Sequence, residues 1–474
     1  MTRIRLVSRR RFLQKVTATA ALSALPSPAP SASEDKPRPR VEVEEDVYRF
    51  EPANNGSGPM WCSGSTCLVR IGDDVFASGI ETLRDVKPLN NCRWLFFQRA
   101  PQGWQRVQTD PIGRTREPCP LVGFPDGRLF LSANPTLTAL GAHGGLSRPE
   151  IVQLAARDPK APGTTLVPTW DGRPAFSEHS YRSFAADGVN QELILFQNIG
   201  YTHSEWSFRD RRGQWGARGR LIWPWGAEYD RPQPIRVCYP NVLLKDRAVH
   251  FCGVSDIHEP YEVFRTAKKK ITGRNWDYDF RRLFYTWTPD ITTGKFHPWV
   301  EIASRDKTCG WIFPGDLWLA PDGAVHVSWT ERALDERLRQ QFFPQEVQSH
   351  AINCAVVRNG KVVSRRTLAV AREKESNEIP SSPRFQVTPD NRLFLIYFVQ
   401  GRDARGRHVA ENRLLELRQD GTASPSVRVP LRHPLSHYFT ATIRGGSPPS
   451  RTLELLGNRL ASSGTMSYAR IRIE

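Results

Sequence analysis

Short runs of alternating apolar and polar residues recur along most of the chain and predict β-strands rather than helices. The runs come in pairs around a tight turn, as in FPDGRLFLSA around Asp126-Gly127 and APDGAVHVSW around Asp322-Gly323. Asx-Gly turns between alternating runs are strong hairpin signals. Turns of this kind recur at intervals of 52 to 76 residues and predict seven units, centred on residues 74, 126, 187, 246, 322, 390 and 457.

A second, weaker turn follows the first in most of these units. Two hairpin turns per unit imply about four strands per unit. Repeated four-stranded antiparallel sheets predict an all-β fold, a seven-bladed β-propeller. The last unit lacks a second clear turn, so we expect the run Val47 to Phe50 to complete it. Six blades remain an alternative, because the long step from 246 to 322 leaves the count open. The second turns are Gln102-Gly103, Arg212-Gly213, Asn359-Gly360 and Asp420-Gly421.

Helical patterns are scarce. The segment Leu334 to Gln341 predicts one or two helical turns, and Tyr261 to Thr272 is ambiguous. The alternating charged run Trp276 to Arg282 predicts an exposed strand with ion pairs along it.

The N-terminus has the pattern of an export signal. Ser8 to Leu13 reads SRRRFL, which is typical of a twin-arginine signal, and an apolar stretch and a small-residue cleavage site follow it. We therefore expect residues 1–33 to be a signal peptide, residues 34–45 a linker, and residues 46–474 a single propeller domain. The expected location is the periplasm or the outside of the cell. No later stretch is long and apolar enough to predict a membrane span.

The net charge of the chain indicates which class of partner to expect. The formal charge is +17, and removal of the signal's six basic residues leaves about +11. Outside the cytoplasm, a basic protein of this kind is expected to meet an anionic polysaccharide, and no nucleic-acid-binding motif is present. We expect a monomer.

Eight cysteines allow some disulfides, and Cys238 and Cys252 flank the turn at Lys245-Asp246 symmetrically enough to face each other. No zinc motif is present, and a structural Ca²⁺ or Zn²⁺ is left open.

Hairpin geometry selects candidate site residues. Residues just before the innermost strand of a blade and just after its second strand meet on one face of a propeller. His179 and His203 bracket the third unit in this way, and Tyr239 opens the fourth. Tyr and His can transfer protons, Arg can bind a carboxylate through two hydrogen bonds, and Trp offers a flat face to a sugar ring. The candidate catalytic residues are His179, His203 and Tyr239, and the candidate substrate-binding residues are Tyr201, Arg236, Asp256, Glu259, Trp311 and Arg384.

The same rule selects further residues with weaker claims. They are Glu178, Glu205, Ser255, His258, Asp316, Trp329, Glu331, Arg332, Tyr397, His437 and Tyr438.

The chain resembles the BNR-repeat β-propellers of the sialidase-like superfamily, and within them, distantly, the ulvan lyases. The resemblance covers roughly residues 115 to 400 and rests on His179, His203 and the pair Tyr239-Pro240. It implies that these His and Tyr residues move protons in the cleavage of a uronate, while an arginine neutralises the carboxylate. Two departures stand out. Ser255-Asp256 occupy the place of the lyases' arginine, so Arg236 or Arg265 would replace it, and the repeat motif survives only at stretched spacing in residues 207–215.

These patterns predict an exported enzyme that cleaves an anionic, uronate-containing polysaccharide by β-elimination. Two alternatives stay open. One is a sialidase-like glycoside hydrolase with paired carboxylates, and the other is a propeller that binds sugars without catalysis. The carboxylates available to a hydrolase are Asp256, Glu259, Glu205 and Glu331.

Overall fold

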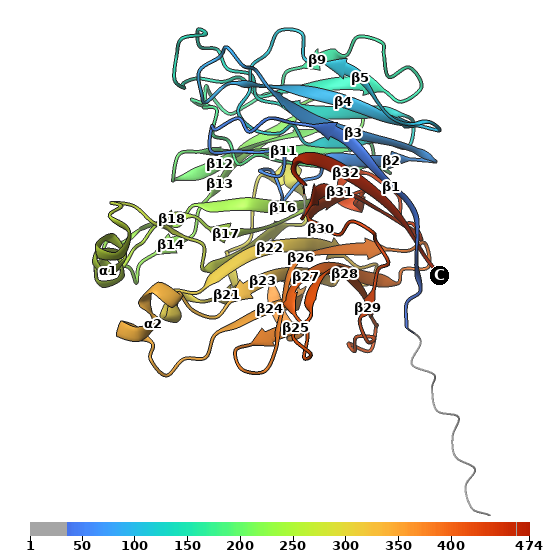
Figure 1. Ribbon diagram of the computed structural model, residues 1–474. Coiled ribbons are helices and arrows are strands. Elements are labelled where there is room, and N and C mark those ends of the chain that lie inside the picture. Colours follow the sequence, from blue (N-terminus) through green and yellow to red (C-terminus); the bar gives the residue numbers. More distant parts are fainter. Residues whose placement is uncertain (1–35, 461) are drawn as a thin grey trace, which may run out of the picture. The chain divides into compact units, whose positions relative to one another are not determined.

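The computed structural model describes residues 36–460 and 462–474, so the predicted signal peptide lies outside the described residues. Over these ranges, seven four-stranded antiparallel sheets form a seven-bladed β-propeller (Figure 1). The innermost strands of successive blades are neighbours around a ring, and the ring closes between the first blade and the last. The prediction of seven blades is confirmed, and the alternative of six is not.

Blades 1 to 3 follow the chain without interruption, and each consists of four consecutive strands. Blade 1 comprises β2 (Leu68–Ile71), β3 (Asp74–Thr82), β4 (Cys92–Ala100) and β5 (Gly103–Thr109). Blade 2 comprises β6 (Leu121–Gly123), β7 (Arg128–Ala133), β8 (Glu150–Ala155) and β9 (Thr164–Leu166). Blade 3 comprises β10 (Ser183–Asp187), β11 (Glu192–Ile199), β12 (His203–Arg209) and β13 (Ala217–Ile222).

Blades 4 to 6 have the same strand order, and blades 4 and 5 carry helical insertions. Blade 4 comprises β16 (Val237–Lys245), β17 (Ala248–Ser255), β20 (Arg282–Thr288) and β21 (Val300–Ser304). Blade 5 comprises β22 (Trp311–Leu319), β23 (Val325–Arg332), β24 (Ser349–Arg358) and β25 (Lys361–Arg372). Blade 6 comprises β26 (Asn377–Val387), β27 (Leu393–Arg402), β28 (His408–Leu417) and β29 (Val427–Arg428).

Blade 7 joins the two ends of the described chain. It comprises β30 (Leu435–Thr440), β31 (Thr452–Arg459), β32 (Ser462–Ile473) and, as its outer strand, β1 (Pro39–Arg49). The N-terminal run therefore completes the last blade, as expected. Since β1 begins at Pro39, residues 39–45, which we expected to belong to the linker, lie in the outer strand of blade 7. The turn predicted at Gly457-Asn458 is wrong, because both residues lie within β31.

The long step between the fourth and fifth turns is an insertion in blade 4. Between β17 and β20 the chain forms β18 (Ile257–His258), α1 (Glu262–Thr272) and β19 (Tyr278–Asp279). In blade 5, α2 (Glu336–Phe342) follows β23 and packs beside α1 (Figure 1). The run Trp276 to Arg282, predicted as one strand, is split between β19 and the start of β20, and Arg281 within it is buried.

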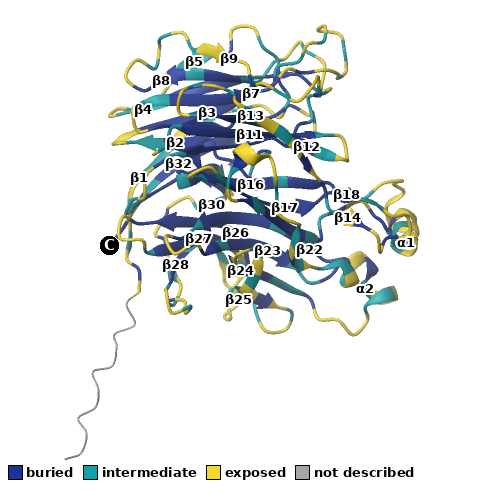
Figure 2. Cartoon of the chain, turned by 180° about the vertical axis from the view of Figure 1, so that it is seen from behind, coloured by how far each residue is buried: buried dark blue, intermediate teal, exposed yellow. Residues whose placement is uncertain are grey.

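The core lies between the blades, because each sheet packs both of its faces against its neighbours. The middle strands are therefore buried on both sides, as the dark interior of the sheets in Figure 2 shows. Between blades 3 and 4, for example, the rings of Phe196 and Phe251 lie 5.2 Å apart. Aromatic side chains of this size supply much of the apolar area that stabilises a propeller.

Arg444 holds several blades together at the centre of the ring. It lies on η3 (Ile443–Gly445), a short 3₁₀ turn between β30 and β31. Its buried guanidinium donates to the carboxylate of Asp316 at 2.6 Å and to the carbonyl oxygen of Gly64 at 2.9 Å. It also donates to Asn241 Oδ1 at 3.0 Å. Arg444 thus connects the innermost strands of blades 4 and 5 to the segment that precedes blade 1.

The predicted cross-strand pair of Cys238 and Cys252 is wrong. Cys238 is opposite Val254, and Cys252 is opposite Asn241, because a bulge shifts the register between β16 and β17. Both cysteines are buried free thiols.

Candidate functional site

Four neighbouring blades carry a register shift near the start of the innermost strand. The shifts lie between Cys238 and Asn241 in β16, between Pro314 and Leu317 in β22, between Ser381 and Arg384 in β26, and between Leu435 and His437 in β30. A bulge leaves extra residues without cross-strand partners and redirects their side chains. Tyr239, with φ 50°, and Ser382, with φ 55°, occupy the left-handed region at two of these bulges. Both side chains line the pocket described below.

The segment before blade 1 crosses the centre of the ring on the face where these bulges lie. We call its residues 58–65 the crossing segment. Phe184 of blade 3 donates its backbone N–H to Ser65 Oγ at 3.1 Å. Gly64 lies so close to blade 4 that a Cβ atom there would be 2.3 Å from the carbonyl oxygen of Pro240. This approach places the indole ring of Trp61 5.7 Å from the ring of Tyr239.

A pocket of about 440 Å³ opens beside the crossing segment. That volume lies within the range of about 300–1,000 Å³ that is typical of small-molecule sites. Aromatic rings form much of its wall, and hydroxyl, amide and imidazole groups supply the polar part. Its lining includes Met60, Trp61, Ser63, Tyr239, Trp311, Phe313, Pro314, Thr330, Ser381, Ser382, Arg384, His437, Tyr438 and Asn458. We call it the aromatic pocket.

Arg384 is a buried cation in the aromatic pocket without a carboxylate partner. Its guanidinium donates to three backbone carbonyl oxygens, those of Ser63 at 2.8 Å, Tyr438 at 3.3 Å and Gly315. Among the described residues, no Asp or Glu lies within ion-pair distance of it. Burial lowers the pKa of Arg384, the charge of Asp316 only partly offsets this effect, and Arg444, with which Asp316 is paired, adds to the lowering. A buried charge is costly when it is unpaired, so this site favours an anionic ligand.

Two proton-transfer groups share the pocket with Arg384. Burial, together with the nearby Asp256 and Cys238, raises the pKa of Tyr239 well above that of a free phenol, so the hydroxyl stays protonated at neutral pH. Burial and the charge of Arg384 lower the pKa of His437, although its side chain reaches solvent, so its imidazole is neutral at pH 7. A neutral imidazole can accept a proton, and a protonated phenol can donate one.

His179 lies next to the pocket, behind two aromatic rings. Its ring centroid is 4.4 Å from that of Tyr181 and 5.7 Å from that of Trp61. Its Nδ1 lies 3.3 Å from Oε1 of Glu117, which is fully buried. Although burial alone would raise the pKa of Glu117, the contacts with His179, Arg182 and Ser180 outweigh it and lower that pKa to about 2.

His203 is on the same face as His179 but in a different environment. It opens the third strand of blade 3, and its Nε2 lies 3.0 Å from Oε1 of Glu205. Glu205 also accepts a hydrogen bond from Arg220 at 2.8 Å. No contact connects the two histidines among the described residues. Chain direction therefore places them on one face but not in one site.

Arg236 and Asp256 form a buried ion pair, with Nη2 and Oδ2 2.9 Å apart. The guanidinium also lies beneath the exposed ring of Tyr201, with Cζ 3.9 Å from the ring centroid. Arg236 is therefore engaged within the protein, and the role of carboxylate clamp predicted for it stays a prediction. Tyr201 is outside the aromatic pocket. Of the predicted substrate-binding residues, Trp311 and Arg384 line that pocket.

The carboxylates predicted for a hydrolase are engaged in internal contacts. Asp256 pairs with Arg236, and Glu205 is held by His203 and Arg220. Glu259 contacts Lys268 and Arg281 beneath the blade 4 insertion, and Glu331 accepts a hydrogen bond from Trp329 Nε1. All are buried. No Asp or Glu is among the described residues that line the aromatic pocket.

Glu117, Trp61 and Tyr181 were missed by the sequence reasoning. Glu117 and Tyr181 precede the innermost strands of blades 2 and 3, so the rule that selected His179 would have found them if applied to every residue in these positions. Trp61 gives no comparable signal, because its place depends on how the crossing segment packs.

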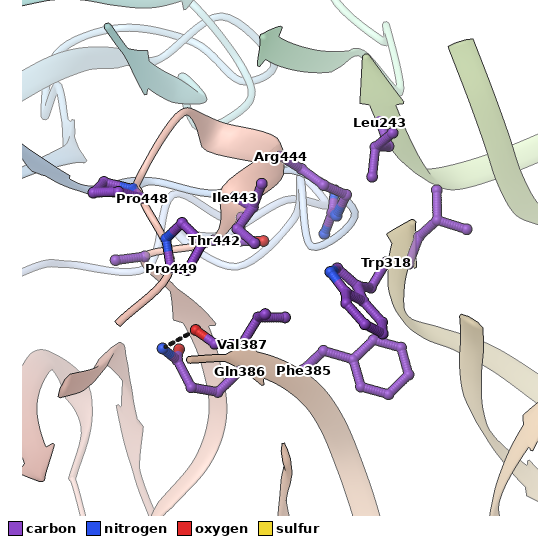
Figure 3. A pocket seen from close by; sticks show the side chains of 12 residues that line it. Leu243, Trp318, Phe385, Gln386, Val387, Thr442, Ile443, Arg444, Pro448 and Pro449 are labelled. Atoms are coloured by element: carbon purple, nitrogen blue, oxygen red, sulfur yellow. Dashed lines mark hydrogen bonds between the residues drawn. The ribbon is translucent and has the colours of Figure 1, made fainter. Parts of the chain in front are cut away.

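The opposite face of the ring holds a much smaller cavity, of about 20 Å³ (Figure 3). It lies where the innermost strands end, and Trp318, Phe385 and the two prolines Pro448 and Pro449 form much of its wall. Arg444 borders it and is already paired with Asp316. No His, Asp or Glu lines it among the described residues. A larger pocket of about 480 Å³ on the same face shares Trp318 and Arg444 with it. That pocket is lined in part by Asp187, Lys245 and Asp246, whose charges are paired with one another.

No cluster of His, Cys, Asp and Glu in residues 36–460 and 462–474 has the arrangement of a metal site. A structural Ca²⁺ or Zn²⁺ therefore gains no support from the described side chains.

Over the same residues, no helix combines the length and the apolar character needed to cross a membrane.

No family model matches the chain, and no curated protein sequence matches it. Similar solved structures include a protein of unknown function from Dyadobacter fermentans, with 10% identity over 92% of this chain and 99% of that one, at a TM-score of 0.45. An α-L-arabinanase from Penicillium chrysogenum, solved with arabinobiose, has 11% identity over 92% and 98%, at 0.42. The β-propeller domain of the Trilobed protease from Pyrococcus furiosus has 7% identity over 85% and 93%, at 0.42. At such values, these likenesses carry no argument about activity.

Proposed function

We propose that the protein cleaves an anionic, uronate-containing polysaccharide by β-elimination in the aromatic pocket. The observation that carries the proposal is the guanidinium of Arg384, which is buried in a pocket with aromatic walls and has no carboxylate within ion-pair distance among the described residues. The nearby Asp316 is already paired with Arg444. The carboxylate of a uronate would supply the missing negative charge, and the rings of Trp311 and Tyr239 would contact the sugar. The distant resemblance to ulvan lyases agrees with this chemistry.

The residues of the pocket match the needs of each step. Arg384 neutralises the uronate carboxylate and stabilises the enolate that develops when the C5–H bond breaks. His437, held neutral, accepts that proton. Tyr239, held protonated, donates a proton to the departing oxygen as the C4–O bond breaks and the C4–C5 double bond forms. The products are an unsaturated uronate end and a new hydroxyl end.

His179 takes a supporting role in this proposal. It is separated from the pocket by Trp61 and Tyr181, and Tyr181 in turn lies 5.1 Å from Tyr239, measured between ring centroids. We place it as a positioning residue that fixes these rings through its contact with Glu117. His203 has no part in the proposed reaction.

The test is a screen of alginate, polygalacturonate, glucuronan and hyaluronan with the purified protein. β-Elimination creates a double bond conjugated to the carboxylate, so ultraviolet absorbance should rise with one of these polymers. Tyr239→Phe keeps the ring and removes the acid, so it should lower that rate by about 10²–10⁴-fold.

Other outcomes would replace the proposal. New reducing ends without a rise in absorbance would indicate hydrolysis, and retention of the protein by a polymer without any product would indicate a binding propeller. A Tyr239→Phe variant with wild-type turnover would remove the phenol from the mechanism.

We propose that this activity lies outside the cytoplasm, because residues 8–13 have the pattern of an export signal. We propose export by the twin-arginine pathway, which accepts folded proteins. Replacing Arg9 and Arg10 with lysine should leave the activity in the cytoplasmic fraction, and unchanged export of that variant would exclude this route.

A further inference from the structure

Exposed aromatic side chains form a row on the pocket's face of blades 3 and 4. Tyr201 is 42% exposed, Tyr278 38% and Trp276 52%, and His258 is exposed as well. Their rings are neighbours: Tyr201 and His258 are 6.2 Å apart, His258 and Tyr278 are 5.1 Å apart, and Tyr278 and Trp276 are 6.2 Å apart. Exposed large apolar groups in a contiguous arrangement mark interaction sites, whereas isolated ones do not.

The row is continuous with the aromatic pocket. Phe280 is 6.3 Å from Tyr278 on one side and 6.1 Å from Tyr239 on the other. Tyr239 is part of the pocket wall. A chain of ring contacts therefore runs from the pocket to the outer part of blade 4.

The protein holds these rings in place from below. The guanidinium of Arg236 lies 3.9 Å from the ring centroid of Tyr201 and 6.0 Å from that of Tyr278. Because Arg236 is buried and paired with Asp256, it gives both rings a fixed support. The backbones of β18 and β19 pair His258 with Tyr278. Rings that are fixed in advance lose little side-chain entropy when a ligand binds.

Positive charge lies at the outer end of the row. Arg274 stacks on Trp276, with Cζ 5.5 Å from the ring centroid, and forms no ion pair among the described residues. A ligand that carries both sugar rings and negative charge fits this surface. Its sugar rings would contact the aromatic faces of the row, and its negative charge would pair with the guanidinium of Arg274.

We infer that Tyr201, His258, Tyr278 and Trp276 form an extended binding track for the polysaccharide chain outside the aromatic pocket. This inference rests on the proposed function and adds to it that the protein binds internal stretches of a long anionic polymer. Short oligosaccharides, which the pocket alone accommodates, do not reach the track. The track therefore contributes to polymer affinity and leaves the chemistry at Tyr239 and Arg384 unchanged.

The test separates long from short substrates. Native gels containing alginate, polygalacturonate, glucuronan or hyaluronan should retard the wild-type protein on at least one polymer. Trp276→Ala and Tyr278→Ala together should weaken that retention by about tenfold or more, the equivalent of about 1.4 kcal/mol. The same double variant should act on a trisaccharide of that polymer at the wild-type rate. Trp276→Phe, which keeps a ring, should restore most of the lost retention.

Trp225 provides the matched control. It is 60% exposed and makes no ring contact with another aromatic residue among those described, so Trp225→Ala should leave retention unchanged. Unchanged retention of the Trp276→Ala, Tyr278→Ala variant would overturn the track even if the protein cleaves the polymer. Retention that depends on these residues, with no unsaturated product, would support the track and overturn only the proposed reaction. No retention on any of the four polymers would overturn the track, whereas the absorbance screen decides the proposed reaction separately.

Discussion

The imidazole of His179 contacts the carboxylate of Glu117, with Nδ1 3.3 Å from Oε1, and this contact links blade 2 to blade 3. Ser180 adds two hydrogen bonds to the same carboxylate, from its backbone N–H at 2.9 Å and from its hydroxyl at 2.6 Å. Arg182 lies 3.9 Å away on the other side. Glu117 is therefore a buried anion on which the ring positions around His179 depend.

Glu117→Gln should destabilise the protein and remove part of its acid sensitivity. The pKa of Glu117 is lowered from 4.5 to about 2 in the folded protein. Its stabilising effect is therefore complete above the unfolded pKa and is lost as the pH falls from about 4.5 toward 2, and it amounts to about 2–4 kcal/mol. Urea unfolding at about pH 6 and about pH 3 measures this, since the wild type should lose more stability between these two values than the variant. Equal losses would show that Glu117 is not the titrating group.

The pH dependence of cleavage should identify His437 as the base. The pKa of His437 is lowered by burial and by Arg384, so the imidazole stays neutral to below its ordinary pKa of about 6.5. The acid limb of kcat/KM should then have its midpoint below that value, and His437→Asn should remove most of the activity. Rates measured across the pH range decide this. A midpoint above 6.5, or an active asparagine variant, would assign the base to another residue such as His179.

The seven blades could be predicted from sequence because each blade has a local signal. Asp126-Gly127 and Asp322-Gly323 form turns between adjacent strands, and their side-chain alternation follows from strand geometry alone. The same locality explains one error. Gly457-Asn458 has the composition of a hairpin turn, yet pairing with Tyr438 and His437 of β30 keeps both residues in a strand of blade 7.

The site was harder to predict because its key contacts join distant segments. The rule of chain direction places His179, His203 and Tyr239 on one face, and it does so correctly for all of them. The rule does not predict how far a residue lies from the centre of the ring. His203 lies farther from the centre than His179 because it opens the third strand of its blade. The bulge at Tyr239 also shifted Cys238 away from Cys252. Trp61 reaches the pocket only because the crossing segment packs against blade 4.

Arg384→Met should remove the preference for a charged substrate. The thioether fills similar space but cannot neutralise a carboxylate, so the variant should cleave the uronate polymer and its methyl ester at similarly low rates. The wild type should prefer the free acid by about 10²-fold or more. Rates on the polymer before and after methyl esterification measure this preference. Since the change also leaves the carbonyl oxygens of Ser63 and Tyr438 without their donor, thermal unfolding must show that the variant is folded.

A variant that keeps its preference for the free acid would show that Arg384 serves only to join the crossing segment to blades 5 and 7. Arg384→Lys refines the result, because it keeps the charge but not the two-pronged geometry. It should retain the preference with a raised KM.

Asp316→Asn should weaken the centre of the ring more than it slows the reaction. Arg444 donates to Asp316 Oδ1 through Nε at 3.0 Å and through Nη2 at 2.6 Å, and both side chains are buried. Removing one partner of such a pair leaves the other charge unpaired and costs about 3–5 kcal/mol. Neither residue lines the aromatic pocket, but the charge of Asp316 acts on Arg384. The value of kcat on the cleaved polymer should therefore fall by less than in Arg384→Met at temperatures where the variant is folded.

The double variant Asp316→Asn, Arg444→Met measures how much the interaction between the two side chains contributes, apart from their contacts with other residues. If the ion pair itself is the reason for the loss, the double variant should be less destabilised than the sum of the two single variants, by about 1–3 kcal/mol in a cycle measured by urea unfolding. Additive losses would mean that Arg444 acts mainly through the carbonyl oxygen of Gly64 and the side chain of Asn241, and thus through the crossing segment. In that case Arg444→Met alone should also lower kcat, because Trp61 and the pocket wall depend on that segment.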